Sequence, residues 1–374
     1  MERTKILSIV SYLILPYHSG GQKSIAQFNE FLGEQCDLTV ISTVNNDTSL
    51  AQNYTMLGWM HSGLSKFFQF SLIFRLKKLI ETQKIQYIML EHPYFGWLGW
   101  VLRLLCNTKL VIHTHNVEYM RFKSLGKIWW PILMWYERWI LRSADAVFCI
   151  SEDDRQFFIK HFGLETNKTT VITFGIPEGT IPADKKTSAN RVRQLHQIAA
   201  DTTIILFNGS LQYYPNAQAV QDIIEHINPR LLAIETLNYI IIICGKGLPA
   251  HFDDLTAYKD KHVLYTGLVP NIELYFKAAD IFINPVLSGG GIKTKLVEAL
   301  GYNTTVISTE NGAIGCDKPA SGPKLVTVKD HDWNGFSEAI INNIGKSVET
   351  PASFYDIYYW GSITKKALAH IQQL

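Results

Sequence analysis

Short apolar runs rich in β-branched residues recur along the chain, separated by longer segments in which apolar residues return every three or four positions. Such runs predict strands buried on both faces, and the periodic segments predict the helices that cover a parallel sheet. Five strands are predicted in the first half, at 5–15, 37–42, 85–90, 109–115 and 146–151. Five more are predicted in the second half, at 202–210, 239–245, 262–267, 281–285 and 305–309.

Residues 174–191 separate the two sets of strands and predict a linker, because they are rich in proline, glycine and polar residues. Residues 142–154 and 277–289 share one order: a helix end, Ala-Asp, an apolar strand and a polar loop. The predicted fold class is α/β, with two doubly wound, Rossmann-like parallel-sheet domains facing each other across a cleft. We place the first domain at 1–175, the second at 176–352, and a C-terminal helix at 353–374.

Composition narrows the class of protein. The 374 residues are 47% hydrophobic and 18% charged, which is typical of globular domains. A net charge of +2 does not favour nucleic acid as a partner. The 5 cysteines form no CxxC pair, which indicates a reducing compartment without a disulfide framework or a zinc site.

The N-terminal stretch "MERTKILSIVSYLILP" has the basic start and apolar run of a signal peptide, but no small-residue cleavage site follows. We interpret it as a first buried strand that runs into a loop at 16–21. No apolar run reaches the roughly 18 residues that a membrane-spanning helix needs. The chain is expected not to cross a membrane.

Three glycine-bearing loops follow predicted strands, at 16–21, 208–216 and 285–291. Glycine lets backbone N–H groups approach an oxyanion, and a helix N-terminus adds favourable partial charge. Taken alone, each loop favours a tight turn. The sequence contains neither GxGxxG nor GxxxxGK[ST], so the standard dinucleotide and P-loop signatures are absent.

The third loop continues into a predicted helix, "GGGIKTKLVEAL" at 289–300. The apolar face of this helix would be formed by Ile292, Leu296, Ala299 and Leu300. In one interpretation, Lys295 and Glu298 form an exposed pair of little energetic value. In the other, the lysines and backbone N–H groups bind a diphosphate, and Glu298 accepts hydrogen bonds from ribose hydroxyls.

Polar residues also cluster at the end of the strand "KLVIHTH". Strand alternation places His113 and His115 on the same face. A histidine at a strand end is usually a structural hydrogen-bonding residue. A metal site is not expected, because no carboxylate lies at ligand spacing in the sequence.

The second half resembles the retaining family-four glycosyltransferases of the GT-B fold. The resemblance is carried by "NGSLQYYPNAQAV" (208–220), "IIICGKG" (241–247), "YTGLV" (265–269) and "PVLSGGGIKTKLVEALGYNTTVISTENGAIG" (285–315). In the first half it rests on Gly20-Gly21, "HTHNVEYMRF" (113–122) and "ERWILRSADAVFCISEDD" (137–154). The C-terminal segment is similar to the helix that crosses back to the first domain in these enzymes.

The resemblance implies roles for individual residues. Glu298 matches the second glutamate of the family's E-x7-E motif, which holds the donor ribose, but Gly290 stands where the first glutamate would be. The basic residues often found around the "GSL" loop are also missing, and Lys293 and Lys295 are expected to compensate by binding the diphosphate. His115 matches the family's post-strand histidine, which faces the transferred sugar, and is the expected catalytic residue.

Two sets of further residues complete the predicted site. The donor-binding set is Gly209, Ser210, Asn216, Lys246, Val269, Gly290, Gly291, Ile292, Lys293, Lys295 and Glu298. The acceptor-side set, which includes a predicted phosphate loop, is Gly20, Gly21, Asn116, Glu118 and Arg121.

Residues 51–142 are basic and aromatic. They contain twelve Lys and Arg against four Asp and Glu, and seven of the 9 tryptophans of the chain. This composition fits either the core of the first domain or a surface that docks on anionic lipid.

The resemblance implies a retaining, metal-independent glycosyltransferase of cell-surface polysaccharide synthesis. Its partners would be a UDP- or GDP-sugar donor, used as a substrate with no cofactor, and a glycan or lipid-linked acceptor. A cytoplasmic location is expected, with peripheral contact on the inner face of the membrane. Two alternatives stay open: a sugar-nucleotide epimerase of the same fold, and a non-catalytic, membrane-associated binding subunit.

Overall fold

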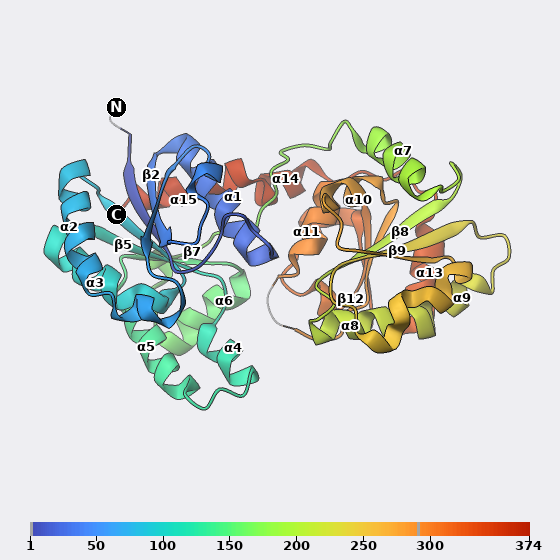
Figure 1. The fold of residues 1–374 in the computed structure, drawn as a ribbon, viewed down its shortest axis with the longest axis horizontal. Coiled ribbons are helices and arrows are strands. Elements are labelled where there is room, and N and C mark those ends of the chain that lie inside the picture. Colours follow the sequence, from blue (N-terminus) through green and yellow to red (C-terminus); the bar gives the residue numbers. More distant parts are fainter. Residues whose placement is uncertain (1–2, 290–291) are drawn as a thin grey trace. The chain divides into compact units, whose positions relative to one another are not determined.

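The computed structural model describes residues 3–289 and 292–374. The chain divides into two compact units, one formed by Met1–Pro177 with Tyr359–Leu374 and the other by Glu178–Tyr358. Each unit contains a parallel β-sheet, with seven strands in the first and six in the second. The predicted α/β class with two parallel sheets is confirmed (Figure 1). The first boundary between units falls inside the predicted linker.

The sheet of the first unit has the strand order β3-β2-β1-β4-β5-β6-β7 and is doubly wound about β1 and β4. Its strands are β1 (Lys5–Val10), β2 (Asp37–Thr43), β3 (Thr55–Met60), β4 (Tyr87–Glu91), β5 (Lys109–Thr114), β6 (Ala146–Cys149) and β7 (Thr169–Val171). Ligands of such sheets bind beyond the carboxyl ends of the strands, where the winding direction reverses. In this unit that point lies at the ends of β1 and β4.

Helices cover both faces of the first sheet. They are α1 (Gly20–Gln35), α2 (Ser71–Gln83), α3 (Gly96–Cys106), α4 (Glu118–Ser124), α5 (Trp130–Ser143), α6 (Glu152–Phe157) and α15 (Trp360–Ile371). Buried leucines and isoleucines of α2, α3 and α5 pack on one face, against Leu7 and Ile9 of β1 and their neighbours. On the other face α1 packs beside α15 (Figure 1).

The C-terminal segment forms two helices instead of the single one predicted. α14 (Ala352–Tyr358) belongs to the second unit, and α15 to the first. The break falls at Tyr359, which pairs with Ile176 in a short parallel bridge. Trp360 then lies fully buried, with its indole N–H donating to Gln27 Oε1 over 3.0 Å. These contacts attach the end of the chain to α1 of the first unit.

The sheet of the second unit has the order β10-β9-β8-β11-β12-β13. Its strands are β8 (Thr203–Asn208), β9 (Tyr239–Cys244), β10 (Val263–Gly267), β11 (Ile281–Asn284), β12 (Thr305–Thr309) and β13 (Leu325–Val328). Its other helices are α7 (Lys185–His196), α8 (Tyr214–Asp222), α9 (Asn228–Leu232), α10 (Ile272–Ala278), α11 (Thr294–Gly301), α12 (Lys318–Ser321) and α13 (Trp333–Asn343).

The repeated Ala-Asp pattern has the same structural role in both units. In the first unit Asp145 precedes β6, and its carboxylate accepts from the backbone N–H of Leu110 over 2.8 Å. In the second unit Asp280 precedes β11 and accepts from the N–H of Ile204, also over 2.8 Å. Each aspartate joins the amino ends of two neighbouring strands, so the similarity of the two segments reflects equivalent positions in two similar sheets.

Candidate functional site

Three histidines gather at the carboxyl ends of β4 and β5 in the first unit. His92 directly follows β4, His113 lies near the end of β5, and His115 directly follows β5. The ring of His115 lies between the other two, with centroids 4.4 Å from each. With Glu91 and Glu118 they form what we call the histidine cluster. Its five members come from neighbouring strands and the helix that follows β5, which is why residues far apart in the sequence meet.

Glu91, the last residue of β4, links two of the histidines. Its Oε2 lies 2.6 Å from His115 Nε2 and 3.2 Å from His113 Nδ1. The other ring nitrogen of His113 lies 3.3 Å from the carbonyl oxygen of Ile172. The expectation that no carboxylate lies at ligand spacing is wrong, because Glu91 pairs in register with His113 across the sheet. Hydrogen bonds among the three side chains account for their arrangement, and a metal-free site stays a prediction.

The ionised carboxylate of Glu91 is stabilised by its two histidine neighbours. Burial alone would raise the pKa of Glu91, but His113 and His115 outweigh it and hold that pKa well below its usual range. Burial, His92 and His113 together lower the pKa of His115 to about 4, against the opposing effect of Glu91. His115 is therefore neutral at pH 7. Because an ionised carboxylate only accepts, His115 Nε2 carries the proton donated to Glu91.

The second carboxylate, Glu118, is the first residue of α4 and is fully buried. Its Oε1 lies 3.0 Å from His92 Nδ1, and its Oε2 accepts from the hydroxyl of Tyr94 over 2.6 Å. Arg121, one turn along α4, donates to the same Oε2 over 3.3 Å. Burial would raise the pKa of Glu118, but these partners lower it to about 2.

The other predicted acceptor-side residues have mixed outcomes. Gly20 and Gly21 were expected in a loop, and this is wrong: they are the first two residues of α1. Ser19 caps this helix, and its hydroxyl accepts from the N–H of Gln22 over 3.4 Å. Asn116 is half-buried in the turn between β5 and α4. The predicted roles of these residues in acceptor binding stay predictions.

In the second unit, the loop after β8 lies against α8. The backbone N–H of Gly209 donates to Cys244 O over 3.1 Å, and Asn216 Nδ2 donates to Ser210 O over 3.0 Å. A Cβ atom on Gly209 would lie 2.6 Å from Asn216 Nδ2, so a larger residue here would displace the Asn216 side chain. Lys246 is exposed, and its backbone carbonyl oxygen accepts a hydrogen bond from the N–H of Leu211 in this loop over 2.9 Å.

Lys295 reaches this loop from the first turn of α11. Its ammonium lies 3.2 Å from Asn208 O, 3.1 Å from Asn216 Oδ1 and 4.5 Å from the centroid of the Phe207 ring. Burial, and then repulsion from Lys293, lower the pKa of Lys295 to about 7. Among the described residues its contacts are thus neutral oxygens and a ring. The interpretation of Lys295 as an exposed surface lysine is wrong.

The remaining residues of the third loop surround the start of α11. The helix begins at Thr294, so Ile292 and Lys293 precede it. Lys293 Nζ donates to Gly289 O over 2.7 Å, and burial lowers the pKa of this lysine. Ile292 packs closely against Gly315: a Cβ atom added to this glycine would lie 2.7 Å from Ile292 Cγ1.

The other described members of the donor-binding set are half-buried. Glu298 is half-buried on α11, and Val269 is half-buried in the loop that follows β10. The predicted donor residues Gly290 and Gly291 lie outside the described residues. The fold alone does not show that any residue of this set binds the donor, so the set stays a prediction.

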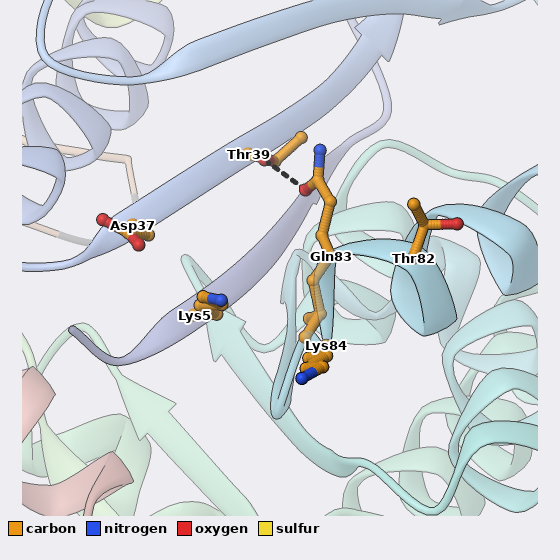
Figure 2. A pocket seen from close by; sticks show the side chains of 7 residues that line it. Lys5, Asp37, Thr39, Thr82, Gln83 and Lys84 are labelled. Atoms are coloured by element: carbon orange, nitrogen blue, oxygen red, sulfur yellow. Dashed lines mark hydrogen bonds between the residues drawn. The ribbon is translucent and has the colours of Figure 1, made fainter. Parts of the chain in front are cut away.

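A hollow of about 350 Å³ lies elsewhere in the first unit, at the amino ends of β1 and β2 (Figure 2). Lys5, Asp37 and Thr39 line it from the sheet, and the end of α2 closes it, with Thr39 Oγ1 3.3 Å from Gln83 Oε1. This is the opposite end of the strands from the histidine cluster. Its side chains do not form a constellation that suggests catalysis.

Sequence reasoning missed Glu91, His92 and Tyr12. The hydroxyl of Tyr12, in the turn after β1, lies 2.8 Å from His92 Nε2. The dipeptide Glu91-His92 at the end of an apolar run was a usable signal, since it repeats the pattern of polar residues that singled out His115. The contribution of Tyr12 depends on the pairing of β1 with β4, which the sequence did not predict.

Two parallel-sheet α/β units are the architecture of the GT-B glycosyltransferases, and the polar and basic groups at the strand ends are compatible with that class. The chain belongs to this class by sequence: residues 18–178 match the family described as Glycosyltransferase Family 4, and residues 202–345 match Glycosyl transferases group 1. The resemblance to family-four glycosyltransferases of the GT-B fold is confirmed, whereas retention of the anomeric configuration stays a prediction.

Individual relatives are distant. The O-antigen biosynthesis glycosyltransferase WbnH of Escherichia coli is 20% identical over 175 residues, which are 45% of this chain and 49% of that protein. The matched region thus spans about half the length of this curated relative. A glycosyltransferase from Rickettsia africae ESF-5 has a TM-score of 0.72 at 13% identity, covering 100% of this chain and 99% of its own. Anabaena Alr3699/HepE, solved with UDP, has a TM-score of 0.71 at 14% identity, with 99% and 100% coverage.

Proposed function

We propose that the chain transfers a sugar from a nucleoside-diphosphate donor to a glycan or lipid-linked acceptor in cell-surface polysaccharide synthesis. The observation that carries this proposal is Lys295, whose half-buried ammonium contacts neutral groups among the described residues and is repelled by Lys293. A buried charge without a counter-charge is costly, so the arrangement favours binding of an anion. The printed names of WbnH, an O-antigen glycosyltransferase, and of HepE with UDP support this choice of substrates.

We infer that the donor's diphosphate binds at Lys295, beside the glycine loop after β8 and the N-terminus of α11. Backbone N–H groups and lysines can stabilise the departing diphosphate as negative charge develops on it, so the chemistry we propose requires neither a metal nor a cofactor. Glu298 would accept the ribose hydroxyls of a UDP- or GDP-sugar. Retention of the anomeric configuration is part of the proposal, and it is supported by the family resemblance.

His115 is the residue that we propose to contact the transferred sugar. Its Nε2–H is used by Glu91, and this leaves Nδ1 of the neutral ring as an acceptor for a sugar hydroxyl. Glu91 fixes both the tautomer and the orientation of the ring. Such preorganisation is what a site needs if it is to recognise one hydroxyl of the sugar.

We also propose peripheral contact of the first unit with the inner face of a membrane, and a cytoplasmic location. No described helix is long and apolar enough to cross a membrane. Of the seven tryptophans in 51–142, Trp59 and Trp97 pack against the core, whereas Trp129, Trp135 and Trp139 are exposed. Ile132, one turn before Trp135 on α5, is 74% exposed. The sequence was compatible with a core or a surface location for these aromatic residues, and the structure places some of them in each.

One assay series tests the proposed transfer. The protein is incubated with UDP-, GDP- and ADP-hexoses, first alone and then with a panel of octyl glycosides and undecyl-diphosphate-linked sugars. Appearance of an elongated glycolipid supports transfer. An isomerised sugar nucleotide without acceptor would indicate the epimerase, and binding without turnover would indicate the non-catalytic subunit. Absence of both binding and turnover with every donor overturns the proposal.

His115→Ala refines the assay. Transfer should fall at least 100-fold, while affinity for UDP changes less than threefold, because the proposed nucleotide contacts all lie in the second unit. His161→Ala, at an exposed histidine of the same unit, is the matched control. A His115→Ala protein with the turnover of the His161→Ala control would remove His115 from the site.

A further inference from the structure

His92 has a backbone conformation that histidine rarely adopts. Its φ is 72° and its ψ is 154°, a region that is almost reserved for glycine and costs on the order of 1–3 kcal/mol. The residue is buried at the carboxyl end of β4, beside the point where the sheet changes its winding direction. Strained residues at such positions frequently serve a site, and the roles assigned above do not use this one.

The ring of His92 joins a hydroxyl to a carboxylate. Tyr12 Oη lies 2.8 Å from Nε2, and Glu118 Oε1 lies 3.0 Å from Nδ1. The three residues follow β1, β4 and β5, which are adjacent in the sheet. A hydroxyl, an imidazole and a carboxylate in this order match the general arrangement of an activated hydroxyl, its base and the group that orients the base.

The direction of the hydrogen bonds follows from Glu118. Its carboxylate is ionised and can only accept, so the hydrogen of the His92 imidazole lies on Nδ1, which donates to Glu118 Oε1. Nε2 is then an acceptor, and the hydroxyl of Tyr12 donates to it. The lone pairs of Tyr12 Oη remain able to accept a hydrogen bond from a further hydroxyl, because Tyr12 is only partly buried.

We propose that Tyr12, His92 and Glu118 form a proton relay that takes the proton of the acceptor hydroxyl during sugar transfer. This inference rests on the proposed function. Tyr12 contacts the acceptor, and His92 and Glu118 are positioning residues that act through it. The neighbouring His115 is a poor alternative as the base, since its low pKa and its bond to Glu91 suit a hydrogen-bonding role.

Two protons and one glycosyl group move in the proposed step. The acceptor O–H bond breaks and its proton moves to Tyr12 Oη, while the Tyr12 proton moves to His92 Nε2. The acceptor oxygen forms a bond to the anomeric carbon of the donor sugar. The bond from that carbon to the diphosphate oxygen breaks, and its electron pair leaves with the nucleoside diphosphate. Glu118 stabilises the resulting imidazolium of His92, which returns its proton to water after the product leaves.

Tyr12→Phe is the central test, with the donor and acceptor that give the highest turnover in the panel above. It removes one hydroxyl and retains the ring that lies 5.5 Å from that of His92. The relay predicts that kcat for transfer falls at least 100-fold, while affinity for UDP changes less than threefold, because the proposed nucleotide contacts lie in the second unit. A solvent isotope effect on kcat, of about twofold in the wild type, should disappear.

Tyr94→Phe is the matched comparison, because it removes a hydroxyl from the other oxygen of the same carboxylate. A purely structural role for the network predicts similar losses in the two variants. The relay predicts that Tyr94→Phe loses less than one tenth as much activity as Tyr12→Phe. Equal losses, or a Tyr12→Phe protein within threefold of the wild type, overturn the relay while wild-type turnover leaves the proposed function intact.

If Tyr12→Phe does not fold, a proton inventory of the wild type in mixtures of H2O and D2O tests the relay instead. Two protons move in the proposed step, so the plot of rate against deuterium fraction should be bowed downward. A linear plot, or no isotope effect under conditions where chemistry limits the rate, overturns the relay.

Discussion

The charged side chains of the two units have different kinds of partners. In the histidine cluster, Glu91 and Glu118 are paired with imidazoles inside the protein. Lys295, by contrast, contacts neutral oxygens. A group that is already paired is ready to orient a substrate, whereas a buried cation without a counter-charge gains most from an anionic ligand. Because of this difference, we assign recognition of the sugar to the first unit and binding of the diphosphate to the second.

The pKa of Lys295 leads to a prediction about nucleotide binding. The pKa is about 7 without ligand, and a bound diphosphate should raise it, because an opposite charge favours the ammonium. The complex then holds more protons than the free protein, so affinity for UDP-glucose should fall as pH rises from about 7 toward the pKa of the complex, by at most tenfold per unit. UDP-glucose suits the test because its diphosphate diester does not titrate in this range. Calorimetry in two buffers of different ionisation enthalpy should detect proton uptake.

Lys295→Met should lower affinity roughly 10- to 100-fold, which corresponds to loss of a charge-assisted hydrogen bond, and should remove the dependence on pH. Lys259→Met, at an exposed lysine of the same unit, is the control and should behave as the wild type. A Lys295→Met protein that keeps the pH dependence would show that another group titrates.

Glu298 allows a second test in the same unit. If its carboxylate accepts both ribose hydroxyls, Glu298→Gln loses the charge and one acceptor, and affinity for the nucleotide should fall about 10- to 100-fold. A 2′-deoxy nucleotide should bind the wild type worse, yet lose little further on the variant, because both changes remove the same interaction. Calorimetry on the four combinations gives the coupling. Additive losses would mean that Glu298 does not contact the ribose.

At the scale of elements, α4 is held in place by a residue of another helix. Glu137 of α5 is fully buried, and its two oxygens accept from the backbone N–H groups of Glu118 and Tyr119 over 2.9 and 3.0 Å. These N–H groups belong to the first turn of α4, where a helix has no internal partners for them. The position of Glu118, and with it the orientation of His92, therefore depends on the packing of α4 against α5.

Glu137→Gln should destabilise the first unit. A glutamine amide offers one oxygen in place of two and turns an NH2 group toward one buried N–H, which costs roughly 1–3 kcal/mol. Urea unfolding followed by tryptophan fluorescence measures the loss. Glu81→Gln removes a carboxylate from an exposed pair with Lys77 and should change stability by less than about 0.5 kcal/mol. Equal effects of the two variants would show that Glu137 does not hold α4.

Elements also show which parts of the fold can be predicted from the sequence. The ten predicted strands include the central strands of both sheets, whose continuous apolar runs are buried on both faces. The strands that were missed, β3, β7 and β13, all lie at sheet edges. An edge strand has fewer neighbours to bury it and can be short or half-exposed. Residues of β3 and β13 are largely half-exposed, and β7 has three residues, so the apolar pattern was weak.

The candidate site was predictable to a similar extent. His115, at the end of a predicted strand, and Lys295, in the helix that follows another, could be identified from motifs. Their partners could not, because Glu91 reaches His115 through strand pairing, and Lys295 meets Asn208 across 87 positions of sequence. Gly20 and Gly21 were assigned to a loop because the cap provided by Ser19 was not recognised. Contacts between distant segments require the topology of the sheet.

At the scale of the whole molecule, positive charge is concentrated in part of the first unit. The modest net charge of +2 conceals the excess of twelve basic over four acidic residues in 51–142. Of those four acids, Glu91, Glu118 and Glu137 are buried and already have partners. Glu81 is the one acidic side chain of this segment at the surface. The exterior of the segment is thus more basic than the composition alone indicates.

Basic and apolar groups occur together on α4 and α5, which lie side by side (Figure 1). Ile128, between these helices, is 92% exposed, and Trp135 is 64% exposed. Lys123 lies 4.6 Å from the centroid of the Trp130 ring, and Arg138 lies 5.9 Å from that of Trp135. Exposed apolar side chains bordered by cations are typical of surfaces that insert shallowly among anionic headgroups.

This surface leads to the last prediction. Binding to vesicles that contain phosphatidylglycerol should exceed binding to neutral phosphatidylcholine vesicles at least tenfold, and should weaken as salt rises, because exposed charges are screened beyond about 8–10 Å at physiological ionic strength.

Lys123→Glu with Lys127→Glu should reduce the preference for anionic lipid. Ile132→Ser with Trp135→Ser should weaken binding to anionic vesicles at least fivefold, and the residual binding should depend more steeply on salt. Leu195→Ser, at a residue of α7 in the second unit that is 63% exposed, controls for a general loss of apolar surface. Sedimentation with vesicles measures all of these proteins. A surface that docks through both charge and apolar contact must respond to the lysine substitutions and to the Ile132 and Trp135 substitutions separately. Equal binding to the two lipids, or equal effects of the Leu195 and Trp135 substitutions, would therefore place the membrane contact elsewhere or exclude it.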